Sequence, residues 1–161
     1  MKTLVVYYSR TGTTKQLAET IAAKLHADTE EIIDTKNRAG PIGWIMAGKD
    51  GSSEATTVIE QTKHDPRDFD VVIIGTPIWA GKMASGVRTY ILQKEEELGE
   101  IAFFITAGSE KVGQCFLGLE QVAGHSPVAK LSLTTKEVRG SDISGKVEAF
   151  ANEVKDSANS G

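Results

Sequence analysis

The sequence contains one cysteine, no apolar run long enough to cross a membrane and no excess of basic residues. A single cysteine, Cys115, allows no internal disulfide, which is typical of a reducing compartment. A transmembrane helix needs about 20 apolar residues, and the apolar runs here are of strand length. The net charge of −4 and the pI of about 5.4 argue against a nucleic-acid surface, which usually carries a basic stripe. We therefore expect a cytoplasmic protein that binds neither membranes nor nucleic acids.

Metal-binding and common nucleotide-binding patterns are missing as well. The three histidines, His26, His64 and His125, have no Cys, Asp or His partner at metal-ligand spacing, so we expect surface or capping roles and no metal site. The chain lacks both Gly-x-x-x-x-Gly-Lys-Ser/Thr and Gly-x-Gly-x-x-Gly. The apolar N-terminal stretch superficially suggests a signal peptide, but it is short and polar turn residues follow it without a cleavage site. It indicates a buried strand.

Strand-like and helix-like segments alternate along the chain. Continuous apolar runs predict strands covered on both faces, and apolar residues three and four positions apart predict helices. The expected strands are residues 4–8, 71–74 and 101–105, with weaker candidates at 29–33 and 128–133. The expected helices are residues 14–25 and 84–98, one containing Cys115 that ends near Gly124, and one after Asp142 or Ser144. Cys115 lies on an apolar helix face, which favours buried packing over a nucleophilic role.

This order predicts a single three-layer α/β domain over residues 1–156. Five parallel strands in the order 2-1-3-4-5, with helices on both faces, follow from right-handed crossovers. Residues 157–161 are expected to form a disordered tail. Residues 37–63 have the weakest pattern, and we expect a loop, a short helix around residues 44–47 and a second short helical piece there.

Signalling receiver domains share this architecture but need acids that the chain does not have. They carry clustered acids after the first strand and a phosphorylatable Asp after the third. The corresponding residues here are Tyr8-Ser9 and Gly75-Thr76. The receiver alternative is therefore rejected.

A hydroxyl-rich loop follows the first strand and leads directly into a helix. In an open parallel sheet, ligands bind beyond the carboxyl ends of the strands, where this loop lies. Its Ser and Thr side chains, with N–H groups at a helix N-terminus, would surround a tetrahedral anion with donors. Gly12 lets the backbone turn tightly. The loop suits a monophosphate held mainly by neutral hydrogen bonds, and a simple Ser/Thr helix cap is the alternative.

The segment from Val5 to Ile21 resembles the flavodoxin signature at every constrained position. These positions are the apolar pair, the aromatic, Ser9, Gly12, Thr14, Ala18 and Ile21. The resemblance extends in order and spacing over nearly the whole chain and implies a flavodoxin-like fold that binds flavin mononucleotide (FMN). It implies that the loop holds the FMN phosphate through side chains of Ser9, Thr11 and Thr14 and through backbone groups of Arg10, Gly12 and Thr13.

The loop after the third strand resembles the second FMN loop of flavodoxin-like quinone reductases, with its Pro-x-Trp/Tyr-x-Gly pattern. Trp79 is suited to stack on the isoalloxazine ring, with Ile78 and Met83 beside it, although a core tryptophan is the alternative. In flavodoxins a peptide beside a glycine such as Gly81 rearranges when the flavin is reduced. The residues assigned to the flavin here are Thr76, Pro77, Ile78, Trp79, Ala80 and Gly81.

The loop after the fourth strand is small and glycine-containing, which would let backbone groups approach the pyrimidine edge of the flavin. Its assigned residues are Thr106, Ala107, Gly108 and Ser109. Typical flavodoxins often place a tyrosine over the ring from this loop, and none occurs between Thr106 and Gly113. One flavin face is thus open or covered from elsewhere. Trp44 is a candidate cover, and an ordinary position on an amphipathic helix is an equal alternative.

Three cations, Arg10, Lys82 and Lys111, fall in or beside these loops, against one acid, Glu110. Cations near the ring would stabilise the anionic reduced flavin. We therefore expect a two-electron couple less negative than in typical flavodoxins, unless these long side chains point into solvent.

The resemblance predicts an FMN-dependent, low-molecular-weight electron carrier between redox proteins. The alternative is an FMN-dependent reductase, fed by NAD(P)H or by a protein, that acts on a quinone or another small acceptor. A minor third possibility is an FMN-free or regulatory relative, since fold alone does not decide function. No catalytic side chain is assigned, because FMN itself supplies redox chemistry. No nicotinamide site is visible, which slightly favours the carrier. Monomer and dimer both remain open.

Overall fold

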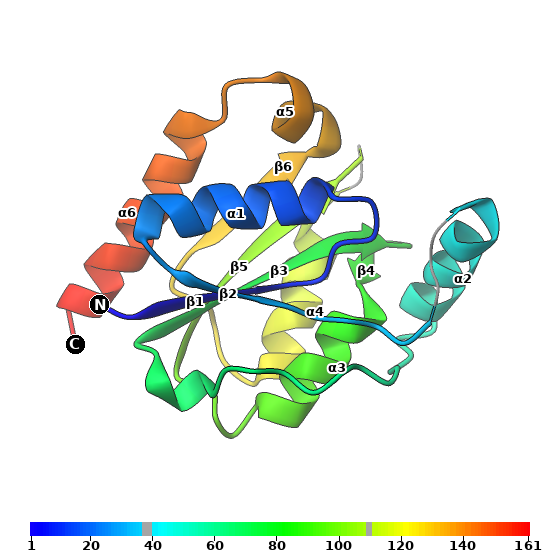
Figure 1. Cartoon of the computed structure of the whole chain (residues 1–161), viewed down its shortest axis with the longest axis horizontal. Helices are drawn as coiled ribbons and strands as arrows, with labels where there is room; N and C mark the ends of the chain where they lie inside the picture. The colour runs from blue at the N-terminus through cyan, green and yellow to red at the C-terminus, as the bar shows by residue number, and fades with distance from the viewer. Residues whose placement is uncertain (37–39, 109–110) are drawn as a thin grey trace.

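A parallel sheet between two layers of helices forms the protein (Figure 1). The computed structural model describes residues 1–36, 40–108 and 111–161, with the backbone alone for residues 51 and 52. The sheet order is β2-β1-β3-β5-β6, which confirms the predicted order of five parallel strands. The strands are β1 (Thr3–Tyr7), β2 (Asp28–Glu31), β3 (Val71–Trp79), β5 (Glu100–Ala107) and β6 (Lys130–Thr134). An additional two-residue strand, β4 (Lys82–Met83), pairs antiparallel with the end of β3.

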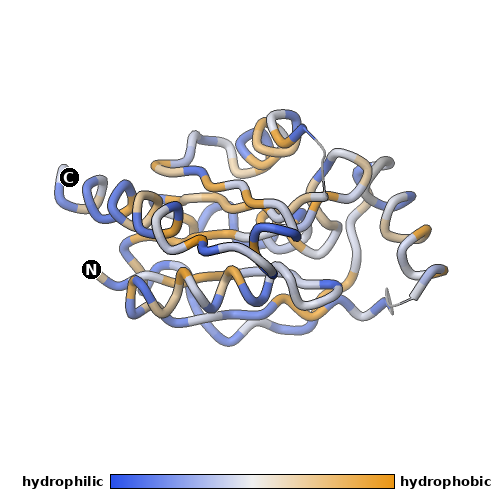
Figure 2. Tube along the Cα trace, turned by 90° about the horizontal axis from the view of Figure 1, so that it is seen from above, coloured by the Kyte–Doolittle hydropathy of each residue, from blue (hydrophilic) through white to orange (hydrophobic). Residues whose placement is uncertain are grey.

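The helices divide between the two faces of the sheet. Helices α1, α5 and α6 cover one face, and α3 and α4 cover the other (Figure 1). Their bounds are α1 (Thr13–Leu25), α2 (Gly40–Ser52), η1 (Pro66–Asp68), α3 (Ser85–Lys94), α4 (Gly113–Ala123), α5 (Thr135–Gly140) and α6 (Ser144–Asn159). Helix α2 projects at the end of the molecule opposite the two termini, and orange hydrophobic stretches mark it in Figure 2.

The continuous apolar runs of the strands arise because successive side chains alternate between two cores. Leu4 and Val6 of β1 pack in the core with α3 and α4, whereas Val5 and Tyr7 pack in the core with α1 and α6. Both faces of β1 are therefore closed to water, as its burial shows. This arrangement positions the loops after the strands along one edge of the sheet.

The region of weakest pattern folds differently from the prediction. Helix α2 is one continuous helix of 13 residues, and residues 55–64 after it contain no helix, so the predicted second helical piece is wrong. Residues 37–39, at the start of the predicted loop, lie outside the described residues. Pro41 at the start of α2 suits the first turn of a helix, where its missing N–H has no partner to lose.

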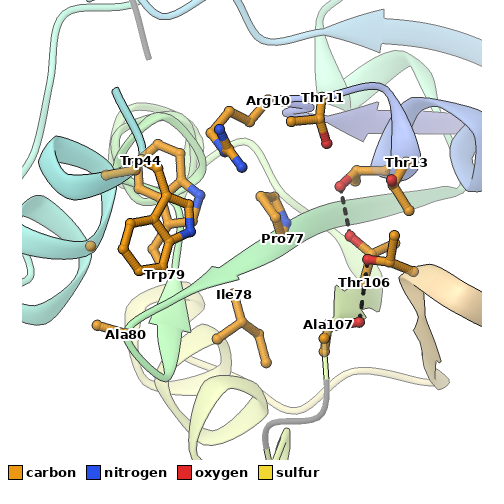
Figure 3. Close-up of a pocket in the computed structure, with 15 residues that line it drawn as sticks. Arg10, Thr11, Thr13, Trp44, Pro77, Ile78, Trp79, Ala80, Thr106 and Ala107 are labelled. Carbon is orange, nitrogen blue, oxygen red and sulfur yellow. Dashed lines mark hydrogen bonds between the residues drawn. The ribbon is translucent and has the colours of Figure 1, made fainter. Parts of the chain in front are cut away.

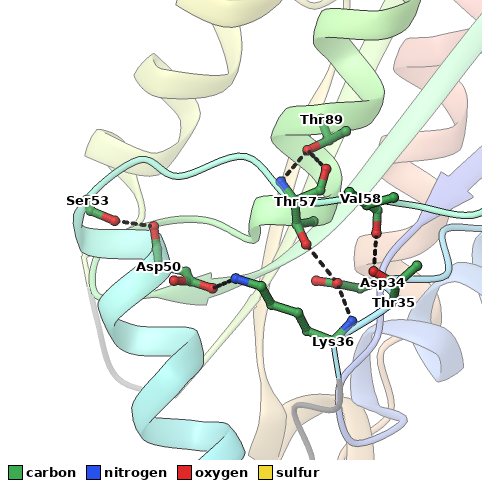
Figure 4. Close-up of polar contacts among 8 residues, drawn as sticks. All are labelled: Asp34, Thr35, Lys36, Asp50, Ser53, Thr57, Val58 and Thr89. Atoms are coloured by element: carbon green, nitrogen blue, oxygen red, sulfur yellow. Dashed lines mark hydrogen bonds and ion pairs between the residues drawn. The ribbon is translucent and has the colours of Figure 1, made fainter.

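Polar contacts tie α2 and the segment after it to the domain (Figure 4). The Lys36 ammonium pairs with the Asp50 carboxylate at 3.2 Å. The Thr57 hydroxyl donates to Asp34 Oδ1 at 2.9 Å, and the Thr57 N–H donates to Thr89 Oγ1 of α3 at 3.0 Å. These bonds span residues distant in sequence, which explains why local periodicity could not predict this arrangement.

Two helix ends also differ from expectation. Helix α3 ends at Lys94 and not at Leu98, and residues 95–97 form a turn. Helix α6 runs to Asn159, into the segment where we expected a disordered tail.

Candidate functional site

A cleft of about 290 Å³ lies beyond the carboxyl ends of β1, β3 and β5 (Figure 3). All three predicted loops contribute to its lining, with Arg10, Thr11, Thr13, Thr14, Pro77, Ile78, Trp79, Ala80, Thr106, Ala107 and Gly108. Helix α2 adds Trp44, Ala47 and Gly48, and α5 adds Thr135. The volume is close to the lower end of small-molecule sites, which span about 300–1,000 Å³. Ser109 lies outside the described residues.

The loop after β1 wraps the N-terminus of α1. Gly12 is the N-cap residue and has a φ of 99°, a left-handed conformation that side chains with a Cβ rarely adopt. Ser9 Oγ accepts hydrogen bonds from the N–H groups of Gly12 at 3.0 Å and Lys15 at 3.1 Å. Ser9 thus performs the capping that Gly12, without a side chain, cannot. Ser9 and Gly12 thus shape the loop without lining the cleft themselves. The Ser9 hydroxyl proton is not used in these two bonds, so it can still be donated.

A hydrogen bond between Thr14 and Thr106 joins the first loop to the third. Their Oγ1 atoms are 2.7 Å apart, and the two residues are only 2% and 4% exposed. Each hydroxyl has one proton and can also accept, so when Thr106 donates, Thr14 keeps its proton for a ligand. The bond fixes the relative position of two cleft walls.

Arg139 of α5 adds a cation to the hydroxyl-rich loop, although no sequence pattern had marked it as a site residue. Its Nε donates to Thr13 Oγ1 at 3.0 Å, and its Nη2 donates to the Thr11 carbonyl at 3.4 Å. Helix α5 is six residues long and mostly exposed, so apolar periodicity does not reveal it. A signal was nevertheless present, because Thr134-x-x-Glu137 is a capping-box pattern.

The capping box holds α5, and hence Arg139, in place. Thr134 Oγ1 accepts from Glu137 N at 3.0 Å, and Glu137 Oε1 accepts from Thr134 N at 3.1 Å. The other carboxylate oxygen, Glu137 Oε2, pairs with Lys146 Nζ at 2.5 Å. Lys146, followed by the N–H of Thr134, lowers the pKa of Glu137 to about 2.

Replacing Glu137 by Gln is expected to lower the melting temperature at pH 7. The folded-state pKa is below the ordinary value of 4.5, so the charged form stabilises the fold above pH 4.5, and this contribution is lost as the pH falls toward about 2. Thermal melts at pH 7 and pH 2.5 check this, with a difference between variant and wild type that shrinks at the lower pH. A Lys146→Met variant should show the same trend. An equal difference at both pH values would contradict the role of the ion pair.

The loop after β3 is a tight hairpin whose base is fixed by Thr76. Thr76 is fully buried, donates to the Pro77 carbonyl at 2.8 Å and accepts from the Ala84 N–H at 3.0 Å. Ala80 and Gly81 at the tip have φ values of 49° and 82°, the positive values that a type I′ turn requires. Thr76 and Gly81 are thus not among the cleft-lining residues.

The two tryptophans differ sharply in exposure. Trp79 is 5% exposed and meets Tyr8 edge-on, with ring centroids 5.3 Å apart, so it forms part of the core as well as a cleft wall. Trp44 is 64% exposed and lies on the α2 side of the cleft (Figure 3). Met83 is 1% exposed and does not line the cleft.

Arg10 is the one member of the three predicted cations that lines the cleft. Lys82 instead pairs with Glu54 and lines a different groove, contrary to its expected place beside the ring. Lys111 is exposed, and Glu110 lies outside the described residues.

Cysteine and histidine take structural roles. Cys115 is 1% exposed in the core, and burial raises the pKa of its thiol to about 12, which leaves no thiolate nucleophile near neutral pH. His26 caps the end of α1, His64 contacts Glu30 at 3.1 Å, and His125 lies 2.9 Å from the Gly99 carbonyl. In the described ranges no three His, Cys, Asp or Glu residues are grouped to hold a metal ion. Nor does any helix there have the length and apolarity to span a membrane.

Comparisons with known proteins agree on one family. A family model described as flavodoxin matches residues 2–150. A flavoprotein from Lactobacillus acidophilus NCFM, solved in complex with FMN, superposes with a TM-score of 0.73 at 23% identity, covering 93% of this chain and 98% of that one. The two-electron reduced flavodoxin of Megasphaera elsdenii gives a TM-score of 0.62 at 15% identity, covering 94% and 96%. At these identities both likenesses concern the fold.

A further relative is an NAD(P)H dehydrogenase (quinone) from Chromohalobacter salexigens. It is 32% identical over 92 residues, which cover 55% of this chain and 45% of the relative. The match thus spans less than half of that protein.

Proposed function

We propose, because this chain belongs to the flavodoxin family, that it binds FMN in the cleft and carries electrons between redox proteins. One observation carries the proposal. The same cleft is lined by a loop of the kind that binds anions and by apolar and aromatic side chains. A loop that carries hydroxyl side chains and leads into a helix N-terminus is suited to bind a phosphate. Flat apolar walls are suited to bind a ring system. The single cysteine fits the cytoplasm as the place of action.

The residues of the cleft fit the parts of FMN. The loop around Gly12 presents backbone N–H groups and the Thr11 and Thr14 hydroxyls to the phosphate, and Arg139 adds positive charge behind Thr13. Ile78 and Ala80 provide an apolar wall for the ring. The backbone of residues 106–108 supplies donors and acceptors for its polar edge. Bound FMN supplies the redox chemistry, so the chain's own residues bind it, orient it and keep water from one face.

A reductase that uses a small acceptor is the second candidate. The partial match to a quinone dehydrogenase favours it, because that relative is named for such an activity. In this case the open side of the cleft near Trp44 would admit NAD(P)H or a quinone. No side chain of the cleft is required as a catalytic acid or base in either case.

Purification followed by an absorption spectrum tests the central claim. A yellow protein, or a colourless one that takes up FMN stoichiometrically, supports FMN binding, and a protein that takes up no FMN would contradict it. Anaerobic addition of NADPH then separates the two functions. Bleaching of the flavin by NADPH alone favours the reductase, and bleaching only through an added redox protein favours the carrier.

Replacing Trp44 by Ala is expected to weaken FMN binding by about fivefold, the worth of one aromatic contact. Because Trp44 is 64% exposed, the melting temperature should hardly change. The bound flavin should also fluoresce more strongly, since a neighbouring indole quenches flavin emission. Fluorescence titration and a thermal melt measure these effects.

Trp79→Ala is the matched comparison for Trp44. Trp79 is 5% exposed, so its loss should destabilise the fold by about 3–5 kcal/mol. If Trp44→Ala changed neither affinity nor emission, Trp44 would not cover the flavin.

Replacing Arg10 by Gln is expected to make the two-electron potential of bound FMN more negative. One cation at a partly exposed site stabilises the anionic reduced form by about 1 kcal/mol, which equals about 20 mV for two electrons. Spectroelectrochemical titration of wild type and variant measures the shift. Lys82→Gln serves as the control, because Lys82 pairs with Glu54 outside the cleft. A strongly depressed potential in the wild type would contradict the predicted effect of the cations.

A further inference from the structure

A second groove, of about 440 Å³, lies between α3, α4 and β4. Helices α3 and α4 run along the same face of the sheet (Figure 1). The β3–β4 hairpin contributes to both sites, because residues 77–80 line the cleft whereas Lys82 and Met83 line the groove. The groove therefore lies next to the proposed FMN site without sharing its lining residues.

Arg88 of α3 is a buried charge that lines this groove. It is 9% exposed, and its guanidinium forms no hydrogen bond or ion pair with the residues that the structure describes. A guanidinium is always charged and has five N–H donors. Charges this deeply buried are normally paired, because removing them from water is costly. An unpartnered guanidinium facing a groove is therefore suited to bind an anion.

The neighbouring carboxylate is already engaged. Glu54 pairs with Lys82, and it is Lys82 first, with a smaller effect from Arg88, that lowers the pKa of Glu54. Arg88 thus interacts electrostatically with Glu54 over a longer distance and forms no ion pair with it. With two cations and one acid, the groove has a net positive charge.

The α4 wall of the groove combines amides with apolar groups. Gln114, Leu117 and Gln121 are spaced three, four and seven residues apart, so they lie on one face of α4. The amide groups can donate to an oxyanion, and Leu117 and Val122 offer an apolar surface beside them.

We propose that this groove binds a small organic anion, with its carboxylate or phosphate oxygens on Arg88 and its apolar part against Leu117 and Val122. The fork of N–H groups on a guanidinium matches the oxygens of either group. The site is independent of FMN, since none of its residues lines the cleft.

The test uses the FMN-saturated protein, so that the hydroxyl-rich loop is not free for the probes; a chain that takes up no FMN is used as purified. Benzoate and phenyl phosphate are titrated separately while the arginine Nε–Hε signals are followed by NMR. The Arg88 signal is expected to shift saturably with at least one probe. A response to benzoate alone identifies a carboxylate ligand, and a response to phenyl phosphate alone identifies a phosphate ligand. No saturable shift with either probe would overturn the proposal.

Two substitutions are expected to change probe affinity in opposite directions. Arg88→Met should weaken binding at least about tenfold, because the charge-assisted hydrogen bonds are lost. Glu54→Gln should tighten it several-fold, because a competing anion is removed next to the site. Arg67→Met, which removes an exposed arginine paired with Asp65, is the charge-matched control and should change nothing in probe binding. Equal probe affinity in Arg88→Met and wild type would overturn the proposal.

The melting temperature separates a binding role from a structural one. Met has a similar length and needs no partner, so Arg88→Met without probe should melt at or above the wild-type temperature. The probe should raise the melting temperature of the wild type and not of this variant. A clear fall in melting temperature for Arg88→Met would show that Arg88 supports the fold, and would overturn its assignment as a binding residue.

Discussion

Replacing Ser9 by Ala together with Thr14 by Val is expected to weaken FMN binding by about a thousandfold. Thr14→Val removes one hydrogen bond to a charged group, which contributes about 1.5–3 kcal/mol, and Ser9→Ala loosens the backbone N–H groups that donate to the phosphate. A loss equivalent to two such bonds corresponds to about 4 kcal/mol, or three powers of ten. The expectation rests on the proposed place of the FMN phosphate in the loop before α1.

The two substitutions act through different parts of the loop. Ser9 Oγ accepts from the N–H groups of Gly12 and Lys15, so Ser9→Ala removes the acceptor that holds the loop closed. Thr14→Val keeps the shape of the side chain but removes its hydroxyl and its bond to Thr106. The first change loosens the phosphate-binding backbone, and the second removes a donor from the cleft.

Riboflavin and two control variants isolate the phosphate contribution. Fluorescence titration should show riboflavin, which lacks the phosphate, binding the double variant and the wild type with similar affinity. Thr14→Ser keeps the hydroxyl and Thr20→Val removes one from the exposed part of α1, where it bonds to the Gln16 carbonyl, so both should bind FMN as the wild type does. An FMN affinity of the double variant within about threefold of wild type would place the phosphate elsewhere.

Sequence patterns predicted the sheet because both faces of its strands are buried. In β1 alternate residues enter two different cores, so the run from Leu4 to Tyr7 is apolar without interruption. The same burial at Val71 to Ile74 marked β3, and the order of parallel strands followed from their alternation with helices. Burial of both strand faces produces a local apolar run in the sequence, so the strands and their order could be predicted.

Segments that are held by polar or long-range contacts could not be predicted from apolar patterns. Helix α5 has one buried residue, Val138, and is fixed by its capping box. The segment after α2 is held by bonds of Thr57 to Asp34 and Thr89, 23 and 32 residues away in sequence. No apolar periodicity accompanies such contacts, so the irregular path of this segment was missed.

At the site, residue type predicted the loops better than the roles of single residues. Thr76 was assigned to the flavin with the rest of its loop, but its side chain holds the hairpin base. Lys82 is two residues from the cleft-lining Ala80, yet it is on the return strand and pairs with Glu54. Whether a side chain of the β3–β4 hairpin points into the cleft or away from it depends on the alternation of side chains along its strands. The sequence alone did not reveal this hairpin.

Replacing Arg139 by Met is expected to weaken FMN binding by about 10- to 100-fold at pH 7.5. The guanidinium bonds to Thr13 Oγ1 and the Thr11 carbonyl, which places its charge directly behind the loop proposed to hold the phosphate. A cation at an exposed site contributes about 1 kcal/mol per unit of phosphate charge, so its effect on a doubly charged phosphate is about 2 kcal/mol, which lies within this range. Arg139→Lys should recover part of the loss by keeping the charge while losing the fork of N–H donors. Riboflavin affinity should not change in either variant.

The pH dependence of FMN binding tests whether Arg139 acts through charge on the phosphate. A phosphate monoester loses its second proton with a pKa of about 6, and a nearby cation favours the doubly charged form. The phosphate pKa should therefore be lower in the complex than in free FMN, so that binding is tightest above pH 6 and weakens as the pH falls through the range below it. In Arg139→Met this dependence should flatten, because the cation that distinguishes the two phosphate forms is gone. Titrations from pH 5 to pH 8 measure both slopes, and an unchanged slope in the variant would mean that Arg139 only holds Thr13 in position.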